Sequence, residues 1–407
     1  MNAETLRAYA RLLAQKGLNV QPGQNVLIIA ELDQPEFVTL CVEECYKLGA
    51  RKVVVDWTHQ PVSKLHCDCR SLETQSKLED WELARWQWQV DTRPAKLYID
   101  SEDPDGLADI DQEKHSKATA AVRRAIKPYR DQMENHYQWC IAAVPGKAWA
   151  SKMFPALPPD EAVQKLWEAI LATSRAAEGD PVENWNLHNQ QLIQRCERLN
   201  QLGIKSLHYT ASNGTNFTVG LLENGLFAGG KETTIEGIDF NPNSPSEEIF
   251  TSPRAGDAEG ILYATKPLSW SGALIENFWI RFENGKVSDV GAEKNEALLR
   301  KMVAMDEGAS MLGEVALVPY DSPINNTGLL FYNTLFDENA CCHVALGMGF
   351  GNCLRGFENM SIDEIHAAGI NDSIIHVDFM VGAADLDITA TTYDGQEVPI
   401  FRKGNWA

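Results

Sequence analysis

The sequence changes its pattern near residue 205, and this change constrains the fold more than any other feature. Before it, apolar runs of strand length alternate with amphipathic helical segments, which is typical of a parallel sheet. After it, β-branched alternation and turn dipeptides dominate, which is typical of antiparallel strands. We therefore predict an α/β N-terminal domain over residues 1–205 and an α+β, mostly antiparallel C-terminal domain over residues 206–407.

The clearest unit of the N-terminal half lies at its beginning. The apolar run 25–30 is followed by the helical segment 34–48 and then by the β-branched run 52–57. This order predicts two parallel strands joined by a right-handed crossover, as in a Rossmann-like domain. No glycine-rich phosphate loop follows the first run, so a nucleotide site is not supported. Residues 98–100 and 140–144 are expected to add further strands.

Three turn dipeptides divide the C-terminal half into hairpins. Tight two-residue β-turns need positive φ angles, which Asn-Gly and Asp-Gly pairs tolerate best. One strong helix, over residues 295–309, is expected to interrupt the strands. The dipeptides that lie between strand-like runs are Asn213-Gly214, Asn284-Gly285 and Asp394-Gly395.

The charge of the chain limits its partners. The formal net charge of −21 over 407 residues argues against nucleic acid and anionic membrane surfaces, because both are polyanions. No apolar run approaches the roughly 20 residues that a membrane span needs, and the first residues resemble a helix start rather than a signal peptide. Nine cysteines without regular spacing fit reduced thiols, so we expect a cytoplasmic protein.

One strand of the C-terminal half carries polar groups on a face that should be apolar. In the run 374–380, His376 and Asp378 point to one face and apolar side chains to the other, because side chains alternate along a strand. A buried imidazole and carboxylate are costly without a partner, and a divalent cation is a strong partner. Mixed His and carboxylate ligands favour zinc, manganese or cobalt. Further candidate ligands in strand or strand-edge contexts are Glu248, Glu314 and His343.

Two other motifs are weaker signals. Residues 66–69 (His-Cys-Asp-Cys) contain metal-ligand side chains but lack a second ligand pair of matching spacing, so we expect no metal there. Residues 347–351 (Gly-Met-Gly-Phe-Gly) superficially resemble a nucleotide loop, but no clear helix follows. We interpret this segment as a tight loop near the metal site.

Several long motifs occur in the order found in one family of peptidases. The chain resembles the M29 family of metal-dependent aminopeptidases essentially from end to end, including its closing segment 399–406. Several motifs in the right order are far more specific than any one of them. The matching segments are 243–253 (NSPSEEIFTSP), 313–319 (GEVALVP), 321–328 (DSPINNTG), 331–347 (FYNTLFDENACCHVALG) and 376–378 (HVD).

The resemblance implies an activity and a set of site residues. It implies a metallo-aminopeptidase that removes N-terminal residues from short peptides with a free N-terminus, using water activated by two divalent ions (zinc, cobalt or manganese). Glu314 is implied as the ligand that bridges both ions. Glu338 is implied as an acid behind the ligands, a general base or a further ligand, and these roles stay open. The family forms dimers, so a homodimer is expected. The other implied ligands are Glu248, His343, His376 and Asp378.

Phe350 departs from the family pattern. Many members carry a tyrosine at this place, seven residues after the histidine that matches His343. A phenol can donate a hydrogen bond to a developing oxyanion, and loss of such a donor typically costs on the order of 100-fold or more in rate. The alternative reading is therefore a weakly active or repurposed member that acts in peptide binding or assembly. A different metal-dependent amidohydrolase is a third reading.

Overall fold

The packing of the chain divides it into two compact units. The computed structural model describes residues 1–270 and 273–407. The first unit contains Met1–Leu187 and Lys231–Pro245, and the second contains His188–Gly230 and Ser246–Ala407.

This division differs from the single boundary that the sequence indicates near residue 205. Strand β10 (Asn243–Ser244) pairs in parallel with β4 (Trp139–Ala143), so residues 231–245 pack with the first unit. Pairing between strands so far apart in the chain leaves no local signal in the sequence. Whether residues 1–205 and 206–407 fold as separate domains stays a prediction.

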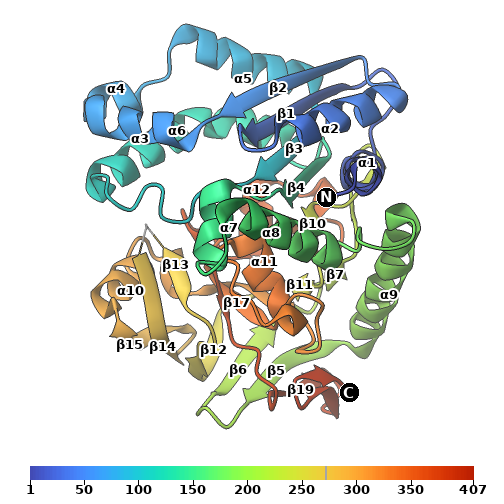
Figure 1. Cartoon of the computed structure of the whole chain (residues 1–407). Helices are drawn as coiled ribbons and strands as arrows, with labels where there is room; N and C mark the ends of the chain where they lie inside the picture. The colour runs from blue at the N-terminus through green and yellow to red at the C-terminus, as the bar shows by residue number, and fades with distance from the viewer. Residues whose placement is uncertain (271–272) are drawn as a thin grey trace. The chain divides into compact units, whose positions relative to one another are not determined.

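The first unit is built on a parallel sheet (Figure 1). β1 (Asn25–Glu31), α2 (Pro35–Lys47) and β2 (Lys52–Thr58) form the predicted strand–helix–strand unit. β3 (Ala95–Asp100) pairs with β1, and β4 pairs with β3. All neighbouring strands in the order β10-β4-β3-β1-β2 are parallel, which confirms the α/β fold expected for this part of the chain.

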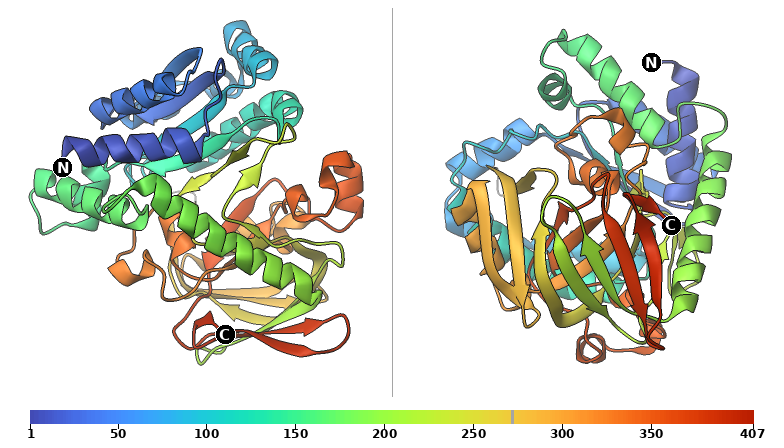
Figure 2. Two further views of the ribbon diagram at one scale, coloured as in Figure 1. Left: turned by 90° about the vertical axis from the view of Figure 1, so that its right-hand side faces the viewer. Right: turned by 90° about the horizontal axis from the view of Figure 1, so that it is seen from below.

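Helices cover both faces of this parallel sheet. The left view of Figure 2 shows α1 (Ala3–Leu12) and α2 on one side, with α5 (Asp80–Thr92) and α6 (Gln112–Met133) on the other. Phe37 and Cys41 of α2 are four residues apart and both buried, because a helix turns residues at this spacing to one face. The remaining helices and strands of this unit are the short π-helix η1 (Leu13–Gly17), α3 (Gln60–Cys69), α4 (Leu72–Ser76), α7 (Lys147–Met153), α8 (Pro159–Thr173), β8 (Glu232–Thr233) and β9 (Asp239–Phe240). Helix α9 (Pro181–Leu202) begins in the first unit and ends in the second.

The second unit contains a large antiparallel sheet, seen in the right view of Figure 2. The three turn dipeptides each connect two paired neighbours, which confirms the predicted hairpins. Helix α10 (Glu296–Val303) is shorter than the predicted 295–309, because the helix ends at Ala304 and a short 3₁₀ helix follows at Gly308–Ser310. In spatial order the strands are β13 (Leu268–Trp270), β14 (Ala273–Glu283), β12 (Pro253–Tyr263), β6 (Asn216–Leu221), β5 (Ile204–Thr210), β19 (Asp387–Thr392), β20 (Glu397–Arg402) and β21 (Asn405–Trp406), and β15 (Lys286–Lys294) pairs with β14.

A second sheet in this unit carries the candidate ligands. One of its faces packs into the hydrophobic core that the large sheet also lines, through Val315, Val344 and Phe379. The side chains that alternate with these three along their strands therefore point to the opposite face of the sheet. Its strands, in order, are β18 (His376–Met380), β17 (His343–Gly347), β16 (Leu312–Leu317), β11 (Ile249–Thr251) and β7 (Ala228–Gly229), and all neighbours are antiparallel.

The described residues contain no helix that is both long enough and apolar enough to cross a bilayer.

Candidate metal centre

Three neighbouring strands align two of the candidate ligands in one row. Glu314 of β16 lies opposite Ala345 of β17, and Ala345 lies opposite Asp378 of β18. The methyl group of Ala345 is thus the only side chain between the two carboxylates in this row. His376 precedes Asp378 by two residues, so it lies on the same face of β18.

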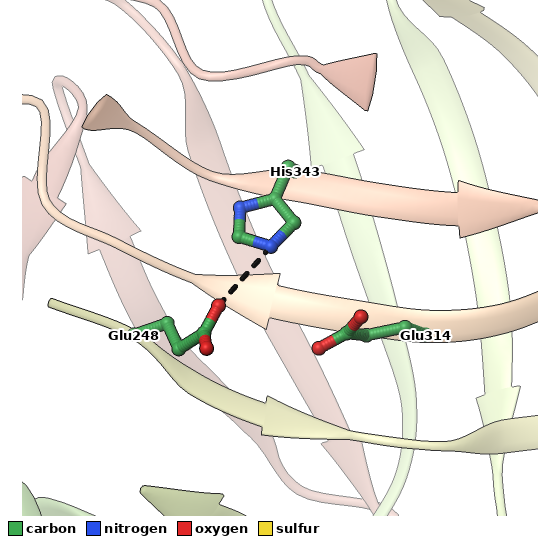
Figure 3. A group of neighbouring side chains, drawn as sticks. All are labelled: Glu248, Glu314 and His343. Atoms are coloured by element: carbon green, nitrogen blue, oxygen red, sulfur yellow. Dashed lines mark ion pairs between the residues drawn. The ribbon is translucent and has the colours of Figure 1, made fainter. Parts of the chain in front are cut away.

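Glu248 reaches the same face from the start of β11. Ile249 is buried in the hydrophobic core, so the side chain of the preceding Glu248 turns to the opposite face. Figure 3 shows that Glu248, Glu314 and His343 are directed toward one another. Oε2 of Glu248 lies 3.2 Å from Nε2 of His343.

The ligand atoms gather into two groups with one shared member. Glu248, Glu314 and His343 form the first group, and Glu314, His376 and Asp378 form the second. Within each group the ligand atoms lie within 4.8 Å of one another. The fold therefore brings together all five residues that the sequence motifs nominate as metal ligands, with Glu314 common to both groups.

Backbone carbonyl groups orient both imidazole rings. Nδ1 of His376 lies 2.7 Å from the carbonyl oxygen of Met348, and Nδ1 of His343 lies 3.3 Å from that of Cys341. With Nδ1 as the donor, Nε2 of each ring faces the carboxylates; in His376 it lies 3.1 Å from Oε2 of Glu314. A carbonyl that holds Nδ1–H is the usual support for a histidine that binds a metal through Nε2.

Burial and neighbouring charges shift the pKa values of the cluster. Burial opposes a charge on His343, but the hydrogen bond and charge of Glu248 outweigh it and hold the pKa of His343 well above its usual value. Burial raises the pKa of Glu314, and burial together with the charges of Asp378 and Glu248 raises that of Glu338. The cluster therefore contains more carboxyl groups than its two imidazoles can balance, and a divalent cation would supply the missing positive charge.

One buried oxygen in the cluster has no hydrogen-bond donor among the described residues. It is Oδ1 of Asp378. Nε2 of His376 lies 3.4 Å away and is closer to Glu314. The ion pair with His376 satisfies this oxygen only in part, and a metal–oxygen bond would satisfy it more fully. Together with a donor set of carboxylate oxygens and imidazole nitrogens, this oxygen shows that the residues fit a divalent metal.

Glu338 lies beside the cluster without joining either ligand group. It begins the short 3₁₀ helix η4 (Glu338–Ala340), which packs against β18. Its carboxylate Oε1 lies 3.4 Å from Nδ2 of Asn339. Neither of the two groups of ligand atoms includes it.

Phe350 lies directly against the cluster. Its ring centroid is 4.8 Å from that of His376 and 5.7 Å from that of Phe250. Its backbone N–H donates to Oγ of Ser252 at 2.7 Å. The loop that contains Phe350 also supplies the Met348 carbonyl that holds His376, so residues 347–351 are a loop of the metal centre, as the sequence predicts.

Two buried amide side chains support the metal centre and were not predicted from the sequence. Nδ2 of Asn371 donates to the carbonyl oxygen of Gly347 at 2.6 Å, at the start of the loop that orients His376. Asn339 hydrogen bonds to the backbone of Glu247 at 2.8 Å, next to Glu248. The place of Asn339 directly after Glu338 was an available signal, whereas nothing in the local sequence distinguishes Asn371.

The weak motif at residues 66–69 lies in α3. Sγ of Cys67 lies 3.4 Å from Nδ1 of His115. Outside the two groups described above, no cluster of three metal-ligand side chains occurs in residues 1–270 and 273–407.

Comparison with known proteins gives matches along the whole chain. The family model of thermophilic metalloproteases (M29) matches residues 2–406. "Aminopeptidase AmpS" of Bacillus subtilis (strain 168) is 39% identical over 406 residues, which covers 100% of this chain and 99% of the relative. "Aminopeptidase T" of Thermus aquaticus is 37% identical over 404 residues, covering 99% and 98%.

Solved structures also match along the whole chain. Wild-type AmpT from Thermus thermophilus superimposes with a TM-score of 0.90 and 36% sequence identity, and the match covers 99% of each chain. A 2,5-dihydroxypyridine dioxygenase from Pseudomonas putida KT2440 reaches a TM-score of 0.54 at 12% identity, which shows likeness of fold alone.

Proposed function

Because the chain belongs to the M29 family of metalloproteases, we propose that it removes the N-terminal residue of short peptides with two divalent ions bound at the described cluster. The relatives that match it from end to end are aminopeptidases, so the enzyme is a metal-dependent aminopeptidase. The observation that carries the two-ion proposal is the sharing of Glu314 by both ligand groups. When bound, such ions polarise a peptide carbonyl and lower the pKa of water.

The proposed ligands divide between the two groups. Glu314, with two carboxylate oxygens, would be a ligand of both ions. Zinc, cobalt and manganese all suit this mixture of carboxylate and imidazole. The first ion would be held by Glu248 and His343, and the second by His376 and Asp378.

We assign the proton transfers to Glu338. It lies half-buried beside the cluster, and it belongs to neither ligand group. Burial and the charges of Asp378 and Glu248 hold its pKa well above the usual value of a glutamic acid. In its ionised form this carboxylate would take a proton from the attacking water and pass it to the leaving amine.

The test of the proposed function compares free and blocked amino termini. Leucine p-nitroanilide should be hydrolysed, and N-acetyl-leucine p-nitroanilide should be hydrolysed on the order of 10⁴-fold more slowly, because a site that binds a polar group rejects the analogue without it. The ratio of kcat/KM for the two compounds measures this. Similar rates for both would contradict an aminopeptidase and favour a different metal-dependent amidohydrolase.

Phe350 favours a second candidate function. Its phenyl ring contacts His376 but offers no donor to an oxyanion. A chain that keeps the metal and loses this donor would be a weakly active or repurposed member, acting in peptide binding or assembly.

Replacing Phe350 with tyrosine distinguishes the two candidates. If the missing phenol limits the reaction, Phe350→Tyr should raise kcat on leucine p-nitroanilide by on the order of 100-fold, because one oxyanion donor is restored. Phe250→Tyr is the matched control, since it adds a hydroxyl to the neighbouring ring. An unchanged kcat in Phe350→Tyr would show that this position does not limit the enzyme.

Two further parts of the proposal rest on the sequence and the family resemblance. We propose that the chain forms a homodimer that admits short peptides. We also propose that it acts in the cytoplasm. Its formal net charge of −21 disfavours nucleic acid and anionic membranes as partners.

A further inference from the structure

The Met348 carbonyl that orients His376 belongs to a loop that one buried residue holds on both sides. This residue is Asn371, whose exposed fraction is 3%. Its Nδ2 donates to the carbonyl oxygen of Gly347 at 2.6 Å, and its backbone carbonyl oxygen accepts from the N–H of Gly349 at 2.9 Å. Asn371 therefore binds the two residues that flank Met348, whose carbonyl oxygen lies 2.7 Å from Nδ1 of His376.

The same amide connects this loop to a second segment of the unit. Nδ2 of Asn371 also donates to the carbonyl oxygen of Gly308 at 2.9 Å, in the short 3₁₀ helix before β16. The Nδ2 atom of asparagine carries two N–H groups, so one side chain can serve both carbonyls. A buried carbonyl that loses its donor is destabilising, so replacement of this amide is expected to move the Gly347 peptide.

Two glycines allow the loop to lie close to the strands that carry the ligands. Gly347 has a φ of +104°, and a Cβ at this position would lie 2.1 Å from the carbonyl oxygen of Ile375. A Cβ at Gly313, which directly precedes Glu314, would lie 2.2 Å from the carbonyl oxygen of Met348. The Met348 carbonyl therefore lies against the strand of Glu314 as well as against the ring of His376.

We propose that Asn371 is a positioning residue that, through the Met348 carbonyl, fixes the ring of His376 in the second ligand group. The inference rests on the proposed metal function. Without the two N–H donors, the Gly347 peptide can turn, and the Met348 carbonyl then no longer holds Nδ1 of His376. Replacing a group that orients a metal-binding histidine typically costs about 10–100-fold in metal affinity or activity.

Asn371→Leu tests the inference by metal binding. Leucine has the same branching as asparagine, and it removes both N–H donors without adding a charge. The EDTA-stripped chain is titrated with zinc by calorimetry, and the wild type should bind two ions. In Asn371→Leu one of the two affinities should fall by about 10–100-fold while the other stays unchanged, because only the second ligand group contains His376. His376→Ala should weaken the same step, which identifies it.

A second measurement follows the ring of His376 itself. In the metal-free chain labelled with ¹⁵N-histidine, the Nδ1–H that the Met348 carbonyl holds should give a resolved proton signal in NMR spectra. This signal should be lost in Asn371→Leu. A residue that only stabilised the unit would lower the melting temperature and leave the signal in place.

Asn184 provides a matched control. Its Nδ2 also donates to two backbone carbonyl oxygens, those of Arg175 at 3.0 Å and Glu178 at 2.8 Å. It lies in the first unit and belongs to neither ligand group. Both Asn184→Leu and Asn371→Leu should lower the melting temperature, and only Asn371→Leu should weaken zinc binding.

Asn371→Ser keeps the test decisive if Asn371→Leu does not fold. Serine leaves room for a water molecule, which can donate to the two carbonyl oxygens in place of the amide. This variant should fold, and one of its two zinc affinities should fall by about tenfold, the lower end of the expected range. If neither variant folds, Asn371 holds the unit together rather than the ring, and the inference is wrong.

Two further results would overturn the inference while the proposed function stands. One is wild-type affinity for both zinc ions in a folded Asn371 variant, and the other is equal weakening of both ions. A wild-type chain that binds no zinc, cobalt or manganese would overturn the proposed function and this inference together.

Discussion

Replacing Glu314 with glutamine should reduce kcat/KM by about 10³-fold or more and leave the fold intact. Glu314 is the one residue common to both ligand groups, so its loss weakens both metal positions at once. Metal ions stabilise the charge that develops in amide hydrolysis by several kcal/mol, and each 1.4 kcal/mol corresponds to about tenfold in rate. Glutamine has nearly the same shape as glutamate, so the buried position in β16 stays filled.

The Glu314→Gln result is measured on leucine p-nitroanilide, with bound metal counted and thermal unfolding followed by circular dichroism. The matched control is Glu283→Gln, which changes an exposed glutamate of strand β14 and should leave activity unchanged. Activity of Glu314→Gln near the wild-type level would show that the bridging assignment is wrong.

Removal of the metal should abolish hydrolysis and lower the melting temperature. Glu314 is buried beside further carboxylates, and without a metal ion the two imidazoles of the cluster compensate their repulsion only in part. A ligand at 100 times its Kd stabilises a folded protein by about 2.7 kcal/mol, and at 1,000 times its Kd by about 4.1 kcal/mol. Stripping the chain with EDTA should therefore lower the melting temperature by several degrees.

Adding the metals back separates the remaining possibilities. Zinc, cobalt and manganese are added singly, and turnover and bound metal are measured in each case. Restored turnover with a metal content near two ions per chain is the expected outcome of the two-ion proposal. Tight binding without turnover on any of a panel of free peptides would favour the weakly active or repurposed member that Phe350 suggests. No binding of any of the three metals would contradict the metal centre.

The local elements of this protein could be predicted because their signals are local. The run 25–57 shows the strand–helix–strand order, and the parallel pairing of β1 and β2 confirms it. The Asn-Gly and Asp-Gly pairs mark hairpins because the turn geometry depends on the two residues themselves. Strand alternation likewise predicts that His376 and Asp378 share a face, since the period of two is a property of the extended backbone.

The residues of the candidate site could be predicted from the sequence, but their arrangement in space could not. Motifs that resemble those of one family named the ligands, yet no local pattern shows that Glu248 and His343 face each other at 3.2 Å. The row of Glu314, Ala345 and Asp378 depends on the register of three strands that long loops separate. The hydrogen bond between Asn339 and the backbone of Glu247 likewise joins residues that are 92 positions apart.

The sequence by itself determined which residues form strands, helices and turns and which side chains share a face, because these properties repeat over a few neighbouring residues. Only the tertiary structure decided that the ligand atoms lie within 4.8 Å of one another in each group and that residues 231–245 pack with the first unit. These outcomes depend on contacts between distant segments. Strand register is set by burying one apolar face of each strand in a common core, and that condition involves the whole unit.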